Sequence, residues 1–239
     1  MTETKNLPRI ERGTTKIVVP HEQGEIAFAW PVQGPHNYQT VGRGIIARRL
    51  NIPNGEGMAS LLHSAYCSNF KDEPEFKEIK NIMKNNWLWV FNRNVWTPNG
   101  LYVADDFEAK GLSEQLNPAE LEEKLKGGTE LSWGGIRFSK DRNIRFAPKG
   151  SYSLGEQTPD KLTKQGDVIA NYGVDGANKL GEVASKFKYN PITYGLNINK
   201  DEQSVQRVAA LDSDVNGDRL RVDGYWFDYG NGYGFGVSN

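Results

Sequence analysis

The chain lacks most of the features that assign a protein to a class from its sequence alone. It has a single cysteine, Cys67, among 239 residues, which excludes an internal disulfide and is typical of a reducing compartment. No apolar run approaches the roughly 20 residues that a membrane-spanning helix needs. The first residues also lack the apolar core of a secretory signal, so the sequence predicts a soluble, cytoplasmic protein without membrane contact.

An excess of charge of one sign is missing too. The 29 Lys and Arg residues nearly balance the 30 Asp and Glu residues, and this balance does not favour nucleic acid as a partner. Apolar residues make up only 37% of the chain while aromatic residues reach 11%, so a few large rings must provide much of the buried surface. No pattern in the chain specifies its oligomeric state.

The distribution of predicted elements indicates the fold class. Amphipathic spacing and capping signals predict about five helices, over 58–66 and 74–87 and beginning near residues 117, 158 and 175. Alternating apolar residues predict hairpins over 15–30 and 133–146, whereas no element is predicted for 31–54. Helices and strands come in groups rather than in strict alternation, which is typical of an α+β fold with a mainly antiparallel sheet on which the helices pack. We expect one domain over residues 1–239, with a sub-boundary near 148–158 as the alternative.

Asn-Gly pairs predict further hairpins, because both central residues of a type I′ turn need φ above zero. A turn at Asn99-Gly100 would fold back a strand that is apolar on both faces, as central strands are, and would pair Trp96 with Val103. The tail is predicted to form a three-stranded antiparallel meander that turns at Asn216-Gly217 and Asn231-Gly232.

The segment around the first tail turn also matches a second pattern, the calcium loop of an EF-hand. The matching residues are Asp212, Asp214, Asn216, Asp218 and Asp223. The hairpin interpretation is favoured because it also accounts for Arg219 and Arg221, which would face Asp214 and Asp212 across the two strands. Calcium remains the minority alternative, and the sequence leaves the cofactor unknown.

One face of the predicted 58–66 helix carries candidate catalytic residues. Ser60, His63, Ser64 and Cys67 lie opposite the apolar stripe, at i, i+3, i+4 and i+7. A His one turn before a Cys would lower the pKa of the thiol and make it a nucleophile, or the pair would supply two ligands of a zinc site. The alternative is that these small residues let the helix pack between two layers. Convergence of His21 and His36 on Cys67 would favour a catalytic site.

Arginines of the predicted 133–146 hairpin are the candidate ligand-binding residues. Matching the apolar faces of its two strands places Arg137 directly opposite Arg145. Like charges opposed across a sheet need compensation, and an anion held by the paired guanidinium groups would provide it. Acidic residues in 105–108 or 120–123 would also provide it, and the near-neutral charge of the chain favours this internal compensation.

The sequence therefore predicts a protein that binds a small anionic or polar ligand, or a partner protein, through an arginine-bearing sheet face. Arg137 and Arg145 would be its anchors, and Arg43 would extend the surface. One alternative is a hydrolase or acyl transferase with Cys67 as nucleophile and His63 as base. The other alternative is a structural or interaction protein without catalysis.

Overall fold

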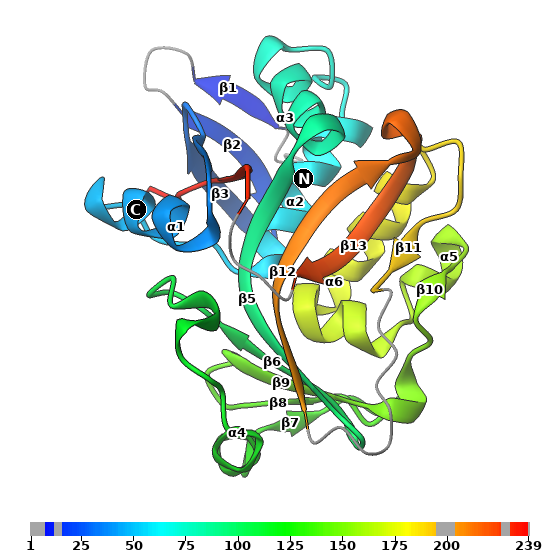
Figure 1. Ribbon diagram of the computed structural model, residues 1–239. Coiled ribbons are helices and arrows are strands. Elements are labelled where there is room, and N and C mark those ends of the chain that lie inside the picture. Colours follow the sequence, from blue (N-terminus) through cyan, green and yellow to red (C-terminus); the bar gives the residue numbers. More distant parts are fainter. Residues whose placement is uncertain (1–7, 12–15, 195–203, 226–229, 239) are drawn as a thin grey trace, which may run out of the picture.

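A computed structural model describes residues 8–11, 16–194, 204–225 and 230–238 (Figure 1). Its helices are α1 (Tyr38–Ala47), α2 (Gly55–Cys67), α3 (Pro74–Asn85), α4 (Pro118–Leu125), α5 (Pro159–Leu162) and α6 (Gly166–Ala184). Short 3-10 turns cover Gly111–Ser113, Lys149–Ser151 and Val215–Gly217. Among the described helices, none is long and apolar enough to cross a membrane.

The described strands form two sheets. The smaller sheet contains β1 (Arg9–Glu11), β2 (Lys16–His21) and β3 (Gly24–Ala29), in that order. The larger sheet contains β4 (Gln33–His36), β5 (Trp87–Thr97), β6 (Gly100–Asp105), β7 (Thr129–Glu130), β8 (Arg137–Phe138), β9 (Ile144–Pro148), β10 (Gly155–Glu156), β11 (Ile192–Thr193), β12 (Val205–Asp214), β13 (Arg219–Tyr225) and β14 (Gly232–Gly234).

The larger sheet is mainly antiparallel. Its spatial order is β10-β11-β13-β12-β5-β6-β9-β8-β7, and β14 lies beside β5 with β4 on its other side. Among these strands the parallel neighbours are β11 with β13 and β14 with β5. The predicted α+β class with a mainly antiparallel sheet is therefore confirmed.

β5 is a central strand of the larger sheet, as its apolar run predicts. It lies between β12 and β6, and Figure 1 shows β5 and β12 running together from the end near α3 to the end near β6 and β9. Trp89 and Trp96 of β5 are fully buried. Truncation of either indole to alanine would therefore cost about 3–5 kcal/mol of unfolding free energy.

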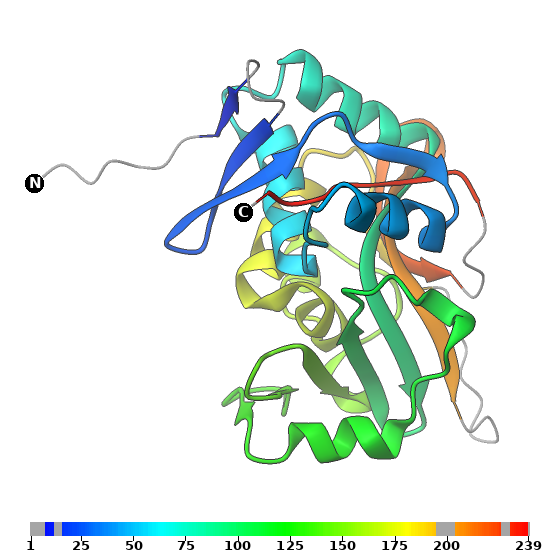
Figure 2. The same ribbon diagram turned by 90° about the vertical axis from the view of Figure 1, so that its left-hand side faces the viewer.

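α2 packs between α6 and the strands, so both of its faces are buried. It contacts α6, β2 and β5, and Figure 2 shows α2 (cyan) and α6 (yellow) on one side of β5. Ser60 and Ser64 are 1% and 2% exposed. A Cβ atom on Gly176 of α6 would lie 3.3 Å from the Cβ atom of Ala59, so the small residues of α2 serve close packing between layers.

The hairpin of β12 and β13 has the predicted register, with Asp214 opposite Arg219. Asn216 and Gly217 adopt φ values of 61° and 90°, in the region that their type of turn requires. The turn is wider than the expected two residues, because the Asp218 amide donates to the Asp214 carbonyl at 3.0 Å.

The predicted three-stranded meander of the tail is wrong. β14 does not follow β13 in the sheet but lies parallel to β5 and antiparallel to β4. A Cβ atom on Gly232 would lie 2.1 Å from Nε1 of Trp89, so glycine allows β14 to approach the indole. An Asn-Gly pair indicates a local turn but not which strand will pair with the residues beside it. Here β4 and β5, which are distant in sequence, are the partners of β14.

The turn between β5 and β6 lies one residue earlier than predicted. Trp96 pairs with Leu101 and not with Val103, which leaves Pro98-Asn99 as the turn. Proline suits the first central position of a turn, because its ring fixes φ near −65°. Gly100 then begins β6 with a φ of 152°.

α1 falls in the segment for which no element is predicted. Asn37 caps this helix, and its Oδ1 accepts a hydrogen bond from the Thr40 amide at 2.8 Å. Gly42 and Gly44 lower the helix propensity of the segment and obscure its pattern. In the fold, a Cβ atom on Gly42 would lie 2.1 Å from the Cβ atom of Ala109, so packing explains glycine at this position.

Candidate functional site

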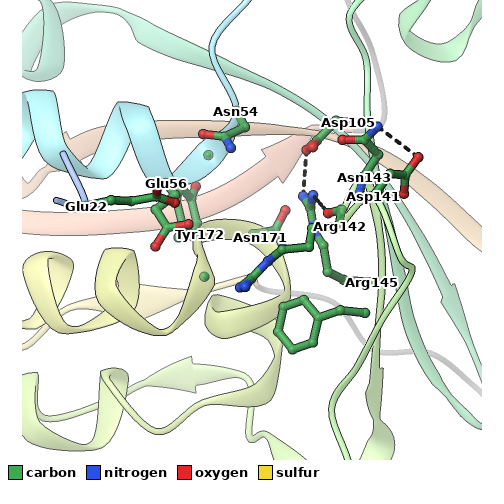
Figure 3. A pocket seen from close by; sticks show the side chains of 13 residues that line it. Glu22, Asn54, Glu56, Asp105, Asp141, Arg142, Asn143, Arg145, Asn171 and Tyr172 are labelled. Atoms are coloured by element: carbon green, nitrogen blue, oxygen red, sulfur yellow. Dashed lines mark hydrogen bonds and ion pairs between the residues drawn. The ribbon is translucent and has the colours of Figure 1, made fainter. Parts of the chain in front are cut away.

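A polar pocket of about 200 Å³ lies where five separate segments of the chain meet (Figure 3). The segments are the β2–β3 turn, the start of α2, the end of β6, the β8–β9 turn and a break in α6. Its charged residues are Glu22, Glu56, Asp105, Asp141, Arg142 and Arg145, and its amide residues are Asn54, Asn143 and Asn171. Pockets for drug-sized ligands occupy roughly 300–1,000 Å³, so this one suits a smaller molecule.

Close packing of α2 against α6 forms one wall of the pocket. Asn54 caps α2, and its Oδ1 accepts a hydrogen bond from the Gly57 amide at 2.9 Å. A Cβ atom on Gly55 would lie 2.0 Å from the carbonyl oxygen of Asn171, so glycine is required where the helices meet. Asn92 of β5 donates to the same carbonyl at 2.8 Å and ties this wall to the sheet.

A break in α6 brings its backbone to the carboxylate of Glu56. Gly173 has φ 72° and ψ 173°, a combination that is essentially restricted to glycine. A Cβ atom at this position would lie 2.8 Å from the carboxylate carbon of Glu56. The sequence signal for a helix capped by Asp175 corresponds to the segment after this break, and the segment from Gly166 to the break was not predicted.

The β8–β9 turn presents Arg142 to the pocket. Oδ1 of Asp141 accepts hydrogen bonds from the Ser139 hydroxyl at 2.6 Å and from the Asn143 amide at 3.2 Å. These bonds close the turn around Arg142, whose φ is 61°, in the left-handed region that non-glycine residues seldom adopt. The exposed arginine is therefore held by a turn with its own hydrogen bonds.

A buried ion pair anchors the same turn to β6. Nη2 of Arg145 donates to Oδ1 of Asp105 at 2.7 Å, and the two side chains are 8% and 3% exposed. Arg145 also donates to the carbonyl oxygens of Ala170 at 2.7 Å and Arg142 at 2.8 Å. Most of its hydrogen-bonding capacity is used inside the protein, so Arg145 holds the pocket together.

Three charged side chains of the pocket form neither an ion pair nor a hydrogen bond with another described residue, namely those of Arg142, Glu22 and Glu56. The guanidinium carbon of Arg142 lies 5.1 Å from the centre of the Phe138 ring. Figure 3 shows Glu22 and Glu56 next to each other, with the Arg142 side chain extending from the turn toward their side. Burial raises the pKa of Glu56, the neighbouring Glu22 raises it further, and Arg142 acts in the opposite direction.

The predicted arginine face does not form. Arg137 lies opposite Phe146 rather than opposite Arg145. The hydrogen bonds of the β8–β9 turn set this register, whereas the prediction matched only the apolar residues of the two strands. Nη1 and Nη2 of Arg137 donate to Oε1 and Oε2 of Glu122, at 2.6 and 2.9 Å. Arg43 is exposed on α1, and neither it nor Arg137 lines the pocket. Internal carboxylates thus compensate Arg137 and Arg145.

His63 and Cys67 line a separate pocket of about 320 Å³. Nε2 of His63 lies 2.8 Å from Oε2 of Glu182 and makes its hydrogen bond there. Burial raises the pKa of the Cys67 thiol, whereas a nucleophilic cysteine needs a lowered one. The structure therefore provides no activation of Cys67 by His63.

The other two histidines do not join Cys67. Nδ1 of His21 lies 3.0 Å from the Ser60 hydroxyl, which also accepts a hydrogen bond from Lys179 at 2.9 Å. Burial lowers the pKa of His21. His36 is exposed at the end of β4. The convergence that would favour a cysteine-dependent site is absent from the described residues.

The residues of the calcium-loop alternative lie on the β12–β13 hairpin, where strands and not a following helix flank them. Asp212 accepts a hydrogen bond from the Tyr225 hydroxyl at 2.8 Å and lies 3.6 Å from Nε of Arg221. Asp223 accepts from the same arginine at 2.6 Å. Within the described ranges, no group of three or more His, Cys, Asp or Glu residues is placed to hold a metal ion.

Sequence reasoning missed the three unpaired residues of the pocket. Each has a local signal: Glu22 lies in a predicted turn, Glu56 lies two residues after a helix cap, and Arg142 lies in a predicted hairpin turn. No local signal connects them, because they lie in the β2–β3 turn, at the start of α2 and in the β8–β9 turn, and these three segments meet only in the folded chain.

Comparisons with known proteins do not assign a role to this pocket. No protein-family model and no curated protein matches the chain. A solved structure described as "Accommodation of massive sequence variation in Nanoarchaeota by the C-type lectin fold" aligns with a TM-score of 0.46 and 12% identity, covering 87% of this chain and 98% of that chain. Likeness at this level carries no functional argument, so only the geometry of the pocket supports a function.

Proposed function

We propose that the protein binds a small, charged polar molecule in the pocket between α2, α6 and the β8–β9 turn. The observation that carries the proposal is the position of Arg142, which faces the pocket without an ion-pair partner among the described residues. An arginine fork binds carboxylates and phosphates through paired hydrogen bonds. A polar ligand would give this fork, and the carboxylates of Glu22 and Glu56, the partners that the described residues do not.

The proposed anchor of the ligand is Arg142 and not Arg137 or Arg145. The sequence predicts Arg137 and Arg145 as anchors, but each is already bonded to a carboxylate. Arg145 supports the site indirectly, because it holds the carbonyl of Arg142 and the end of β6. The contact with the ligand is assigned to Arg142.

Binding is favoured over catalysis by the side chains around the pocket. The described lining residues include no Cys, His or Ser, the residue types that most often act as nucleophile or base in hydrolysis and acyl transfer. The cysteine that the sequence suggests as a nucleophile lies in another pocket, and burial raises its pKa.

The test is a thermal-shift and native mass-spectrometry screen of the full chain. The panel contains free amino acids, small amines, small carboxylic acids and sugar phosphates, each at millimolar concentration. Arg142→Asn removes the guanidinium and keeps a residue type that tolerates positive φ. Arg49→Asn is the matched control, because Arg49 is also exposed with φ 59° and lies outside the pocket.

We expect at least one panel molecule to bind the wild type and the Arg49→Asn variant equally. The same molecule should bind Arg142→Asn about 10- to 100-fold more weakly, the range that loss of a charge-assisted hydrogen bond produces. Equal binding to all three proteins would contradict the proposal, as would a panel in which no molecule binds.

A further inference from the structure

The unpaired charges of the pocket are separated by sign. Glu22 and Glu56 lie together on one side, and Arg142 reaches toward them from the opposite turn (Figure 3). Arg142 forms no ion pair within 4.0 Å of either carboxylate, although its charge is close enough to affect the ionisation of Glu56. The space between them is therefore bounded by negative charge on one side and positive charge on the other.

The carboxylate side has the chemistry of an ammonium site. Glu56 is half-buried beside Glu22, and both burial and this like charge oppose its ionisation. On this side the protein supplies Lys179, which is already paired with Asp175, and the partial positive charge at the start of the α6 segment after Gly173. A bound ammonium group would provide a full positive charge and three hydrogen-bond donors. The carboxylate oxygens of Glu22 and Glu56 would accept these bonds, since they accept none from the described residues.

The guanidinium side has the chemistry of a carboxylate site. The guanidinium carbon of Arg142 lies over the Phe138 ring, 5.1 Å from its centre, in a cation–π contact, and the N–H edge of the guanidinium donates no hydrogen bond to a described residue. That edge matches the two oxygens of a carboxylate. The neighbouring Arg145 cannot take this role, because Asp105 and two carbonyl groups occupy it.

From this arrangement we infer that the ligand is a free amino acid, or an equally small molecule with one amine and one carboxylate. Its amine lies against Glu22 and Glu56, and its carboxylate lies on Arg142. The inference rests on the proposed function and narrows it to a ligand class. A simple anion would meet two carboxylates, a simple amine would leave Arg142 without a partner, and a neutral molecule would leave all three charges uncompensated.

The experiment compares three forms of one ligand by titration calorimetry. The probes are the free amino acid that binds most tightly among the twenty common ones, its N-acetyl form and its carboxamide form. Each probe is titrated into the wild type, Arg142→Asn and Glu56→Gln. The controls are Arg49→Asn and Glu120→Gln, since Glu120 also lies in the first turn of a helix and is outside the pocket.

Blocking the ligand carboxylate should abolish the effect of Arg142→Asn on affinity, and blocking the ligand amine should abolish the effect of Glu56→Gln. We expect the N-acetyl and carboxamide forms to bind the wild type at least about tenfold more weakly than the free amino acid. Arg142→Asn should weaken the free amino acid about tenfold and leave the carboxamide within about twofold. Glu56→Gln should likewise weaken the free amino acid and leave the N-acetyl form within about twofold.

Other outcomes separate this inference from the proposed function. The amino-acid inference is overturned if all three forms bind the wild type equally. It is also overturned if the only molecule whose binding depends on Arg142 is an amine, an acid or a sugar phosphate. In both cases the proposed function is retained. If no molecule binds in a manner that depends on Arg142, both are overturned.

Discussion

Arg145 and Asp105 form an ion pair of 2.7 Å between β9 and the end of β6, and both side chains are more than nine-tenths buried. The pair holds the turn that carries Arg142, because Arg145 also donates to the Arg142 carbonyl at 2.8 Å. A buried charge pair thus determines where an exposed arginine lies. The sequence contains the same residues but presents Arg145 as a candidate for ligand binding.

Arg145→Met should destabilise the protein strongly. The substitution leaves Asp105 buried without its partner, and breaking a buried ion pair on one side costs about 3–5 kcal/mol. Urea denaturation followed by circular dichroism measures the change in the unfolding free energy. Arg137→Met is the control, because its pair with Glu122 is partly exposed and should cost only about 1 kcal/mol. Equal losses for the two variants would contradict the structural role of Arg145.

Asp167→Asn should change how stability depends on pH. Asp167 is fully buried, neither carboxylate oxygen makes a hydrogen bond of normal geometry to a described residue, and burial raises its pKa from 3.8 to about 7. Between these two values the folded state binds more protons than the unfolded state, so this group makes stability fall as pH rises from about 4 to about 7.

The variant removes this fall. Its stability relative to the wild type should increase between pH 5 and pH 8 by an amount on the order of 2 kcal/mol. Chemical denaturation at several pH values measures the difference, and the contribution of other groups cancels because both proteins share them. Parallel pH curves for the two proteins would show that Asp167 is ionised in the folded state.

Cys67 should react slowly with iodoacetamide at neutral pH. Burial raises the pKa of its thiol, and the thiolate is the form that reacts. Mass spectrometry should show a labelling rate at least severalfold below that of the same protein unfolded in urea at the same pH. Labelling of the folded protein at or above the unfolded rate would restore the nucleophile interpretation of Cys67.

Gly173→Ala should destabilise the protein and disturb the pocket together. The backbone at this position is in a region that only glycine adopts readily, and a Cβ atom would lie 2.8 Å from the carboxylate of Glu56. We expect a loss of about 1–3 kcal/mol in unfolding free energy. Gly150→Ala is the control, because nothing lies within 4 Å of its Cβ position. If Gly173→Ala loses no more unfolding free energy than Gly150→Ala, then residue 173 is not the position of the break in α6.

Local sequence determined a large part of this fold. Asn216-Gly217 accounts for the register of β12 and β13, which is why Asp214 faces Arg219 as predicted. Asn117 and Pro118 mark the beginning of α4. Such features depend on hydrogen bonds and backbone angles within a few residues, so the sequence alone can specify them.

Only the tertiary structure decided which charges remain available. Arg145 finds Asp105 and Arg137 finds Glu122 across separate elements, while Arg142, between them in sequence, finds no ion-pair partner among the described residues. The difference is physical. A hydrogen bond in a turn is set by neighbours in the chain, whereas an ion pair or a pocket depends on distances that exist only after α2, α6 and the sheet have packed together.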